Sequence, residues 1–299
     1  MKRLLDNPLA LSGLGIVGFF VALALCGTWL VGDPTEFVGA PLEPPSVAHW
    51  FGTTGQGQDV FAQTIAGASS TLLVGFLVGL LEVLIGALLG TAAGYYGGWI
   101  DELLSLLINV FLILPGLPLI VVLAAYLPAG PGTMILVLVL TGWAWGARVF
   151  RSQTLSLRRR DFVLAAKASG EGDLHIILCE ILPNMSPLLA AAFIGSTLYA
   201  VGAQVGLEFL GLGDVSRVTW GTNLYWASND AALLTGSWWT FVPTGLCVAI
   251  LGFGLAMLNS AIDEIGNPRL ASHKAYEEAQ REAQLKPGLS TPVILGEMP

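Results

Sequence analysis

Few residues in this sequence combine a reactive side chain with a spacing that supports chemistry. The three cysteines, Cys26, Cys179 and Cys247, are isolated, so they predict neither a disulfide framework nor a metal site. The chain contains no phosphate-binding loop of the GxxxxGK[ST] type, and no nucleophile stands beside a base. We therefore expect a chain that is not an enzyme and that holds no cofactor of its own.

One acid stands out because of its surroundings. Glu82 lies in the middle of an apolar stretch, where an acidic side chain is costly in a membrane unless it is paired or faces water. Two interpretations remain open. Glu82 either lines an aqueous passage and meets an ammonium group, or it is a protonated or hydrogen-bonded side chain at a contact between helices.

The one long charged stretch between apolar segments is Arg151 to Ser186. Asp161 is expected to cap a first short helix there, and Gly170 to supply the left-handed residue that ends it. Asp173 is expected to cap a second helix with one apolar stripe. Pro183 should stop that second helix. The pattern predicts a structured insertion of two short helices.

The composition indicates which elements must carry these residues. The chain is 54% hydrophobic and only 11% charged, and its mean hydropathy is +0.72, whereas about a quarter of an average soluble domain is charged. The formal net charge of −8 shows no basic excess that would suggest a nucleic-acid partner. We expect an all-α integral membrane protein with lipid as its solvent.

Six stretches are long enough to cross a hydrocarbon core, which needs roughly 20 apolar residues per helix. They are Leu9–Val31, Thr71–Gly94, Leu103–Tyr126, Thr133–Val149, Pro187–Val205 and Trp239–Ala261. Pro115 and Pro118 should kink or break the third of them. Several glycines lie four residues apart and predict close helix contacts. These are Gly75 and Gly79, then Gly86, Gly90 and Gly94, and finally Gly142 and Gly146.

The basic residues predict the orientation. With the N-terminus inside, 12 of the 13 Lys and Arg residues fall in inner segments, and only Arg217 lies outside. The positive-inside rule then places both termini and the 151–186 loop in the cytoplasm. The predicted organisation is an N-terminal transmembrane helix (1–31), an extracytoplasmic loop (32–70), a core (71–266) and a cytoplasmic tail (267–299), with a second outer loop at 206–238.

The 151–186 loop resembles the cytoplasmic coupling motif of binding-protein-dependent ABC importer permeases. That motif begins with Glu-Ala-Ala, which is followed after a gap of three residues by Gly. After a further gap of nine residues comes a residue that is often Ile, then any residue, Leu and Pro. Here Ala165 and Ala166 precede Gly170, and the run Glu180 to Pro183 follows after nine residues. Leu164 stands where the acid is usual, and Glu180 where Ile is common. A generic amphipathic loop helix, the alternative, does not account for this spacing in a loop that the charges independently place inside.

Other stretches resemble the peptide-importing branch of that family. They are HWFGTTGQGQDVFAQTIAGASSTLLVG before the second span, GYYGGWID at Gly94 to Asp101, GLEFLGLGDVSRVTWGTNL after the fifth span, and Asp263 with Asn267 to Leu270 near the end. Gln58 departs from the branch pattern, which has Arg there. The resemblance spans nearly all of residues 50–270. It is to the second of the two permeases of dipeptide or oligopeptide importers.

This resemblance implies a type I ABC importer permease fold and a set of partners. These are a second related permease, two ATPase subunits that hold ATP and Mg, and an extracytoplasmic peptide-binding protein, in a prokaryotic plasma membrane. It also implies residue roles. The ATPase-coupling residues would be Asp161, Ala165, Ala166, Gly170, Asp173, Leu182 and Pro183, and Asp59, Trp220 and Asn223 would lie in loops that face the binding protein.

Alternatives remain at two levels. Within the importer class, nickel, glutathione or another small solute could replace peptides as the substrate. More distantly, a proton-coupled secondary transporter would need more buried ionisable residues than Glu82 and would show internal repeats. A membrane scaffold without transport activity would have no use for the coupling loop.

Overall fold

The computed structural model describes residues 7–266, so the predicted tail (267–299) and the Asn267–Leu270 match lie outside the described residues. All regular elements in the described range are helices, and two isolated β-bridges, Phe37 with Gln58 and Thr53 with Asp59, tie together the loop before α3. This confirms the all-α prediction. The long helices are α2 (Pro8–Leu30), α3 (Val60–Tyr96), α4 (Gly98–Ile113), α5 (Gly116–Tyr126), α6 (Pro131–Leu157), α10 (Ser186–Phe209) and α13 (Val242–Gly266).

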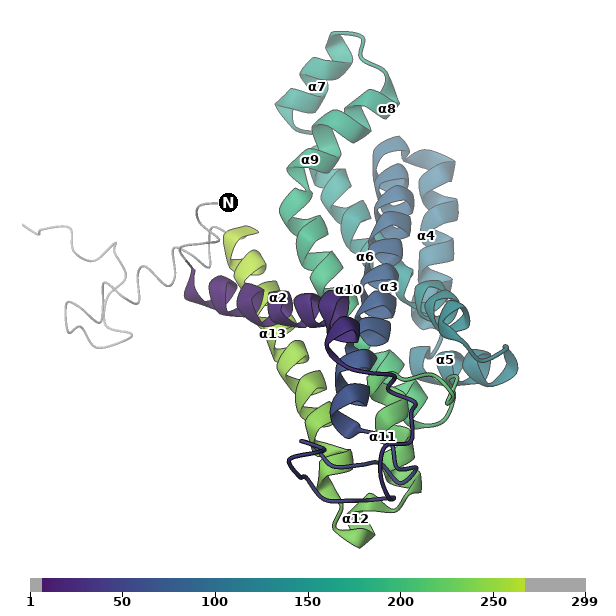
Figure 1. Cartoon of the computed structure of the whole chain (residues 1–299). Coiled ribbons are helices and arrows are strands. Elements are labelled where there is room, and N and C mark those ends of the chain that lie inside the picture. Colours follow the sequence, from purple (N-terminus) through teal and green to yellow (C-terminus); the bar gives the residue numbers. More distant parts are fainter. Residues whose placement is uncertain (1–6, 267–299) are drawn as a thin grey trace, which may run out of the picture.

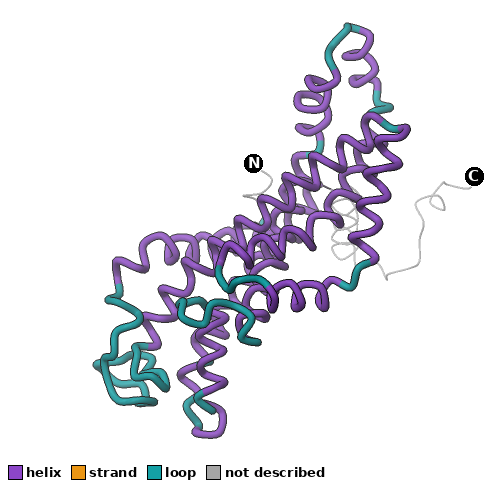
Figure 2. The backbone as a smooth tube through the Cα atoms, turned by 90° about the vertical axis from the view of Figure 1, so that its right-hand side faces the viewer, coloured by secondary structure: helices purple, strands orange, loops and turns teal. Residues whose placement is uncertain are grey.

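The shorter helices lie at the two ends of the long bundle (Figure 1). One end carries α7 (Asp161–Ala168), α8 (Asp173–His175), the π-helix η1 (Ile176–Ile181) and α9 (Leu182–Asn184). The other end carries α11 (Trp220–Asn229), α12 (Ala232–Thr235) and the 3-10 helix η2 (Trp238–Thr240). Figure 2 shows the same division, with a helical hairpin at one end and most of the loop segments at the other.

Five described helices are long and apolar enough to cross a membrane, and a bent pair, α4 with α5, raises the number to six. The two helices of that pair meet at an angle of 83°. The break lies at Leu114 and Pro115, where the backbone is extended, because proline cannot donate the hydrogen bond that would continue α4. The predicted break is confirmed, so Leu103–Tyr126 is not one straight span.

The second predicted span begins earlier than expected, at Val60 instead of Thr71. Asp59 caps α3 by accepting hydrogen bonds from the backbone N–H groups of Phe61 (2.7 Å) and Ala62 (3.2 Å). The first turns of α3 carry polar residues such as Thr64 and Ser69, which a search for apolar runs excludes. The loop predicted for residues 32–70 therefore ends at residue 59.

Glycines set the contact between α3 and α6. A Cβ at Gly90 would overlap the carbonyl oxygen of Ala147, and a Cβ at Gly94 would lie 2.8 Å from the carbonyl oxygen of Arg151. On the same helix, a Cβ at Gly75 would overlap the Val201 side chain of α10. The spacing of four residues thus brings backbones together as predicted.

Helix α2 crosses α13 at a steep angle (Figure 1). Small residues again form the crossing, because a Cβ at Gly13 would lie 2.9 Å from the carbonyl oxygen of Gly254. The start of α2 also lies beside the end of α13, since Asn7 Nδ2 donates a hydrogen bond to Glu264 Oε2 at 3.3 Å. The two ends of the described chain therefore meet.

We expect Gly90→Ala to destabilise the protein, because the added methyl group must push the α3 and α6 backbones apart. Overpacking of this kind costs about 1–3 kcal/mol. The measurement is the midpoint of thermal unfolding in detergent. Gly202→Ala on α10 is the matched control, since a Cβ there meets nothing within 4 Å. Equal midpoints for the two variants would contradict the proposed contact.

Candidate functional site

The predicted coupling loop forms a compact helical hairpin, residues 161–184, which we call the coupling hairpin. It projects beyond the ends of α3 and α4 (Figure 1). Helix α7 ends in a turn at Gly170, whose φ of +82° lies in the left-handed region, as predicted. That region favours glycine because any Cβ would crowd the following carbonyl oxygen. Gly170 therefore lets the chain reverse between α7 and α8.

Both predicted caps in the hairpin are wrong. The N-cap of α7 is Arg160, with no side-chain cap, and Asp161 is the first helical residue. The N-cap of α8 is Gly172, and the Asp173 carboxylate instead accepts a hydrogen bond from the Tyr95 hydroxyl at 2.7 Å. Each acid still lies in the first turn of its helix, where negative charge is favourable.

Pro183 does not stop the second helix where the sequence suggested. The chain widens into the π-helix η1 and continues as α9, in which Pro183 occupies the first turn. Within a continuous helical segment a proline removes one backbone hydrogen bond, and the segment ends one residue after Pro183. The helix ends at Asn184, and Met185 then leads directly into α10.

The hairpin is packed firmly onto the ends of the long helices. Its apolar residues form one cluster with residues of α3 and α6; the buried members are Tyr95, Phe150, Val163, Ala166, Ile176, Ile181 and Met185. Of the predicted coupling residues, Ala166 is 7% exposed and belongs to this cluster, whereas Ala165 and Gly170 are exposed. The motif thus divides between an inner packing face and an outer free face.

The hairpin exposes large apolar side chains among its charged ones, although it lies at the tip of the molecule. The side chains of Leu164, Leu174 and Leu178 are 52%, 67% and 52% exposed. Exposed leucines grouped on a projecting element are typical of a docking surface. Leu164 occupies the position where the resembling family usually has an acid, so docking through this position would be apolar here.

Polar contacts fix the hairpin to α3. In addition to the hydrogen bond with Asp173, the Tyr95 ring lies under the Lys167 ammonium, 4.5 Å from its centroid. Arg158, at the end of α6, donates hydrogen bonds to the carbonyl oxygens of Gly94 (2.9 Å) and Tyr95 (3.3 Å). These contacts attach the hairpin to α3 as well as to α6.

A bidentate ion pair extends this bracing to α4. Arg151 Nε lies 2.5 Å from Asp101 Oδ1, and its NH2 group lies 2.7 Å from Oδ2. Such paired contacts fix orientation as well as distance. Tyr95 and Asp101 both belong to the GYYGGWID match, but the sequence assigns neither of them a role, because their partners are 50 or more positions away in the chain.

A cavity of about 460 Å³ lies between α3, α4, α6, α10 and α13. Glu82 of α3 lines it and is 4% exposed. Towards the hairpin end of the bundle, Leu188 near the start of α10 and Asp263 near the end of α13 complete the lining. Glu82 therefore lies both at a contact between helices and in the wall of a cavity. Each of the two interpretations drawn from the sequence describes one part of this position.

The side chains of Trp220 and Asn223 are buried within the chain. Trp220 is fully buried, and its indole N–H donates to the carbonyl oxygen of Thr64 at 2.9 Å. Asn223 donates to the carbonyl oxygen of Gln63 at 3.1 Å. Both residues fasten α11 to α3; that the segment carrying them faces a binding protein stays a prediction.

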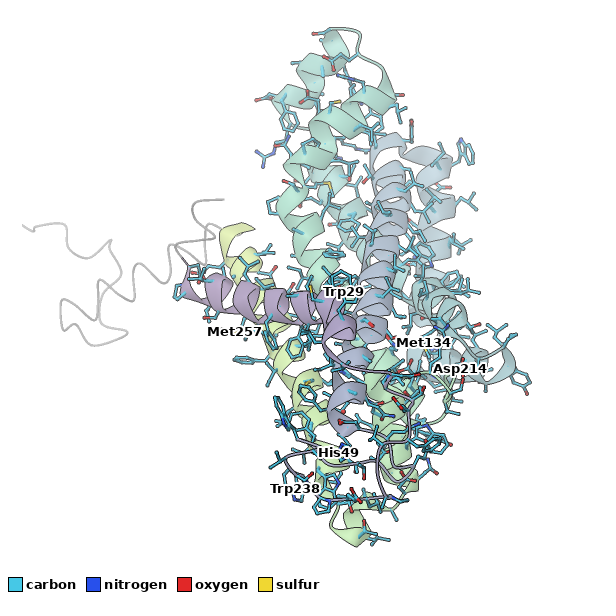
Figure 3. The ribbon with its side chains drawn as sticks, in the orientation of Figure 1. Trp29, His49, Met134, Asp214, Trp238 and Met257 are labelled. Carbon is cyan, nitrogen blue, oxygen red and sulfur yellow. The ribbon has the colours of Figure 1, made fainter. Side chains whose placement is uncertain are left out.

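Asp59 also has a structural role, because its Oδ2 lies 3.2 Å from His49 Nδ1 while its other oxygen caps α3. His49 and Trp238 both lie at the end opposite the hairpin (Figure 3). Asp230 links the loops there. Burial raises the pKa of the Asp230 carboxyl, although a hydrogen bond from the Gly55 backbone N–H acts in the opposite direction.

A second buried acid, Glu208, is a residue that the sequence pattern did not single out. It is 6% exposed and accepts hydrogen bonds from Thr219 Oγ1 (2.5 Å) and Gln204 Nε2 (3.0 Å). These bonds attach the end of α10 to the loop that leads into α11. Glu208 follows the predicted span Pro187–Val205, so it looked like a loop residue. Its apolar neighbours in GLEFLGLG were the available signal.

The comparisons with known proteins agree with this arrangement. The family model described as "Binding-protein-dependent transport system inner membrane component" matches residues 82–264, which include the cavity wall and the coupling hairpin. The chain belongs to this family. It is therefore a permease component of a binding-protein-dependent transport system and a multi-pass membrane protein, as the coupling motif led us to expect.

Curated relatives of this permease component carry peptide-transport names. The dipeptide transport system permease protein DppC of Bacillus subtilis is 34% identical over 276 residues, which cover 90% of this chain and 84% of the relative. The oligopeptide transport system permease protein OppC of Mycobacterium tuberculosis is 34% identical over 222 residues, with 73% and 75% covered. OppC of Bacillus subtilis is 31% identical over 261 residues, with 85% and 84% covered.

We expect Tyr95→Phe to loosen the coupling hairpin of this permease, because the hydrogen bond to Asp173 is lost while the ring stays in place. One such bond contributes about 0.5–1.5 kcal/mol. Hydrogen exchange at the backbone amides of residues 161–184 should accelerate. Tyr96→Phe is the matched control, because Tyr96 is 47% exposed. Identical exchange in the two variants would show that Asp173 is held by other contacts.

Proposed function

We propose that this permease component is one of two permeases of an importer for dipeptides or oligopeptides, driven by ATP hydrolysis on partner subunits. The observation that carries the proposal is the coupling hairpin, which has an exposed apolar tip and a base braced to α3, α4 and α6. The names of the relatives supply the substrate class, since they are dipeptide and oligopeptide permeases.

The hairpin would work as a rigid lever. A groove on an ATPase subunit would receive the exposed face around Leu164 and Ala165, and movement of that groove would displace the hairpin. The chain connects the hairpin directly to α6 and α10. Tyr95 and Arg158 carry the same movement into α3. ATP and Mg would be bound by the partner subunits, which leaves this chain the task of opening and closing the passage.

The charge distribution supports an orientation with the hairpin in the cytoplasm. The three consecutive arginines, 158–160, stand at its base, and positive charge is retained on the cytoplasmic side. The start of α2 and the end of α13 lie side by side, which is consistent with two termini on one side of the membrane. We place both termini in the cytoplasm.

The opposite end would receive the extracytoplasmic binding protein. Large apolar side chains are exposed there: Trp50 (67%), Leu233 (79%), Leu234 (91%) and Trp238 (54%). They lie in the loop before α3 and in the segment from α12 to η2. These residues are our candidates for direct contact with the binding protein, because their side chains are accessible.

The passage would lie between this chain and the second permease. The cavity between α6, α10 and α13 would form this chain's share of it, with Glu82 in its wall. A lever that shifts α3, α6 and α10 would change the width of this cavity, because all three helices line it. Alternating access then follows from movements of helices that the hairpin controls.

We expect Gly170→Val to reduce peptide uptake at least fivefold in proteoliposomes that contain the complete importer. A β-branched residue at a φ of +82° is strained, at a cost of roughly 1–2 kcal/mol, and the turn of the lever would shift. The measurement is ATP-dependent uptake of a radiolabelled dipeptide, together with the amount of ATPase subunit that co-purifies.

Gly172→Val is the matched control for this experiment. A Cβ at either glycine meets nothing within 4 Å, but the φ of Gly172 is −71°, which suits any residue. Uptake by this variant should stay near the wild-type value. The importer proposal fails if both variants transport normally and retain the ATPase subunits, or if the wild-type complex takes up no peptide.

A further inference from the structure

The side chains that line the cavity suit a positively charged ligand. Two carboxylates, Glu82 and Asp263, contribute to its wall, and none of the described residues that line it is lysine, arginine or histidine. The remaining polar side chains are neutral: Thr141, Ser196, Tyr199 and Asn259 can accept hydrogen bonds, and the Trp145 indole can only donate. An anionic ligand would find no positive partner in this wall.

Glu82 is only partly satisfied by its own chain. Its Oε1 atom is buried and has no hydrogen-bond partner among the described residues. The carboxylate fits against α6 only because residue 142 is glycine, since a Cβ there would overlap it. The Ser196 hydroxyl of α10 donates a hydrogen bond to the Glu82 carboxylate, so the unpartnered position is that of Oε1. A buried carboxylate with an empty acceptor position is costly, so a donor from outside this chain would be favourable.

The second buried acid shows what a purely structural carboxylate looks like in this protein. Glu208 receives hydrogen bonds from Thr219, from Gln204 and from the backbone N–H of Gly221. All of these donors belong to its own chain, and they fasten α10 to the following loop. Glu82 has a similar degree of burial but lacks such a set. The difference points to a ligand, because nothing in the described part of the fold uses the free oxygen of Glu82.

We propose that the Glu82 carboxylate binds a primary ammonium group of the transported solute, and that Asp263 is a second acidic position nearer the hairpin end of the cavity. This inference rests on the proposed function, which makes the cavity part of the passage. Two sources supply the same chemistry, the N-terminal ammonium of a peptide and the side chain of a lysine. Glu82 lies in the middle of α3 and Asp263 near the end of α13, so a cation meets Glu82 first on its way towards the hairpin.

Binding to the complete importer in lipid nanodiscs tests this subsite directly. Trp145 lines the cavity, so its fluorescence reports occupancy, and Trp145→Phe identifies its share of the signal. The probes are alanyl-alaninamide, which carries an N-terminal ammonium; its N-acetyl derivative, which is neutral; and N-acetyl-lysinamide, whose only cation is the side chain. Comparison of the first and third probes distinguishes the two sources.

The wild-type protein should bind alanyl-alaninamide at least about tenfold more tightly than the neutral probe, the factor expected for one charge-assisted hydrogen bond. Glu82→Gln should remove this preference and leave binding of the neutral probe unchanged. Asp263→Asn should reduce the preference less, because Asp263 is exposed. Thr91→Val is the matched control, since Thr91 is a buried residue of α3 with an unpartnered hydroxyl outside the cavity lining.

Several results would overturn the subsite. The first is a wild-type protein that binds the cationic and neutral probes equally, and the second is a Glu82→Gln variant that keeps the preference for the cation. The third is loss of the second permease from the purified Glu82→Gln complex, because a residue of that permease would then be the partner of the carboxylate. Uptake separates this inference from the proposed function. Normal peptide uptake with no cation preference rejects only the subsite. A cation preference that depends on Glu82, without any peptide uptake, rejects only the peptide importer.

Discussion

The contact between α3 and α6 is the constraint on which the rest of this structure depends. It is the most extensive helix contact in the described residues, and it exists because glycines remove every side chain that would separate the backbones. Lipid offers no hydrophobic drive for helices to associate, so close van der Waals packing must supply the attraction. Because α6 leads into the coupling hairpin and α3 ends beneath it, this contact also gives the hairpin a rigid base.

The hairpin shows how a short segment can act on several helices. Its apolar inner face and the polar contacts of Tyr95, Arg158 and Arg151 join it to α3 and join α6 to α4. Its outer face exposes the side chains of Leu164, Leu174 and Leu178. A force applied to that face therefore reaches helices that are distant from it in the sequence. This separation of a docking face from a braced base is what a permease needs when its energy source is a different subunit.

Buried polar groups divide into two kinds in this protein. Trp220, Asn223 and Glu208 find their partners within the chain and hold the loops of one end against α3 and α10. Glu82 keeps an oxygen without a partner in the described chain, beside a cavity. A buried polar group that is satisfied stabilises one arrangement, whereas one that is unsatisfied is a cost that the fold retains for another reason. Among the buried atoms without a partner, which also include Thr91 Oγ1, Thr197 Oγ1 and Gln204 Oε1, Glu82 is distinguished as a carboxylate in the wall of that cavity.

The amino-acid sequence by itself determined the elements that depend on local composition. Apolar length predicted the spans, Pro115 predicted the break between α4 and α5, and Gly170 predicted the left-handed turn, because each of these rests on the properties of one residue or one stretch. The spacing of Ala165, Ala166 and Gly170 likewise indicated the family, because a motif consists of residues that are close together along the chain.

Only the tertiary structure decided which partners the polar residues find. Asp173 looked like a helix cap but binds Tyr95, and Trp220 looked like a surface residue of a loop but is buried against α3. The early start of α3 was hidden for the same reason, since its polar first turns are covered by α11 and not by lipid. A side chain's partner depends on contacts between distant segments, and no local pattern in the sequence contains that information.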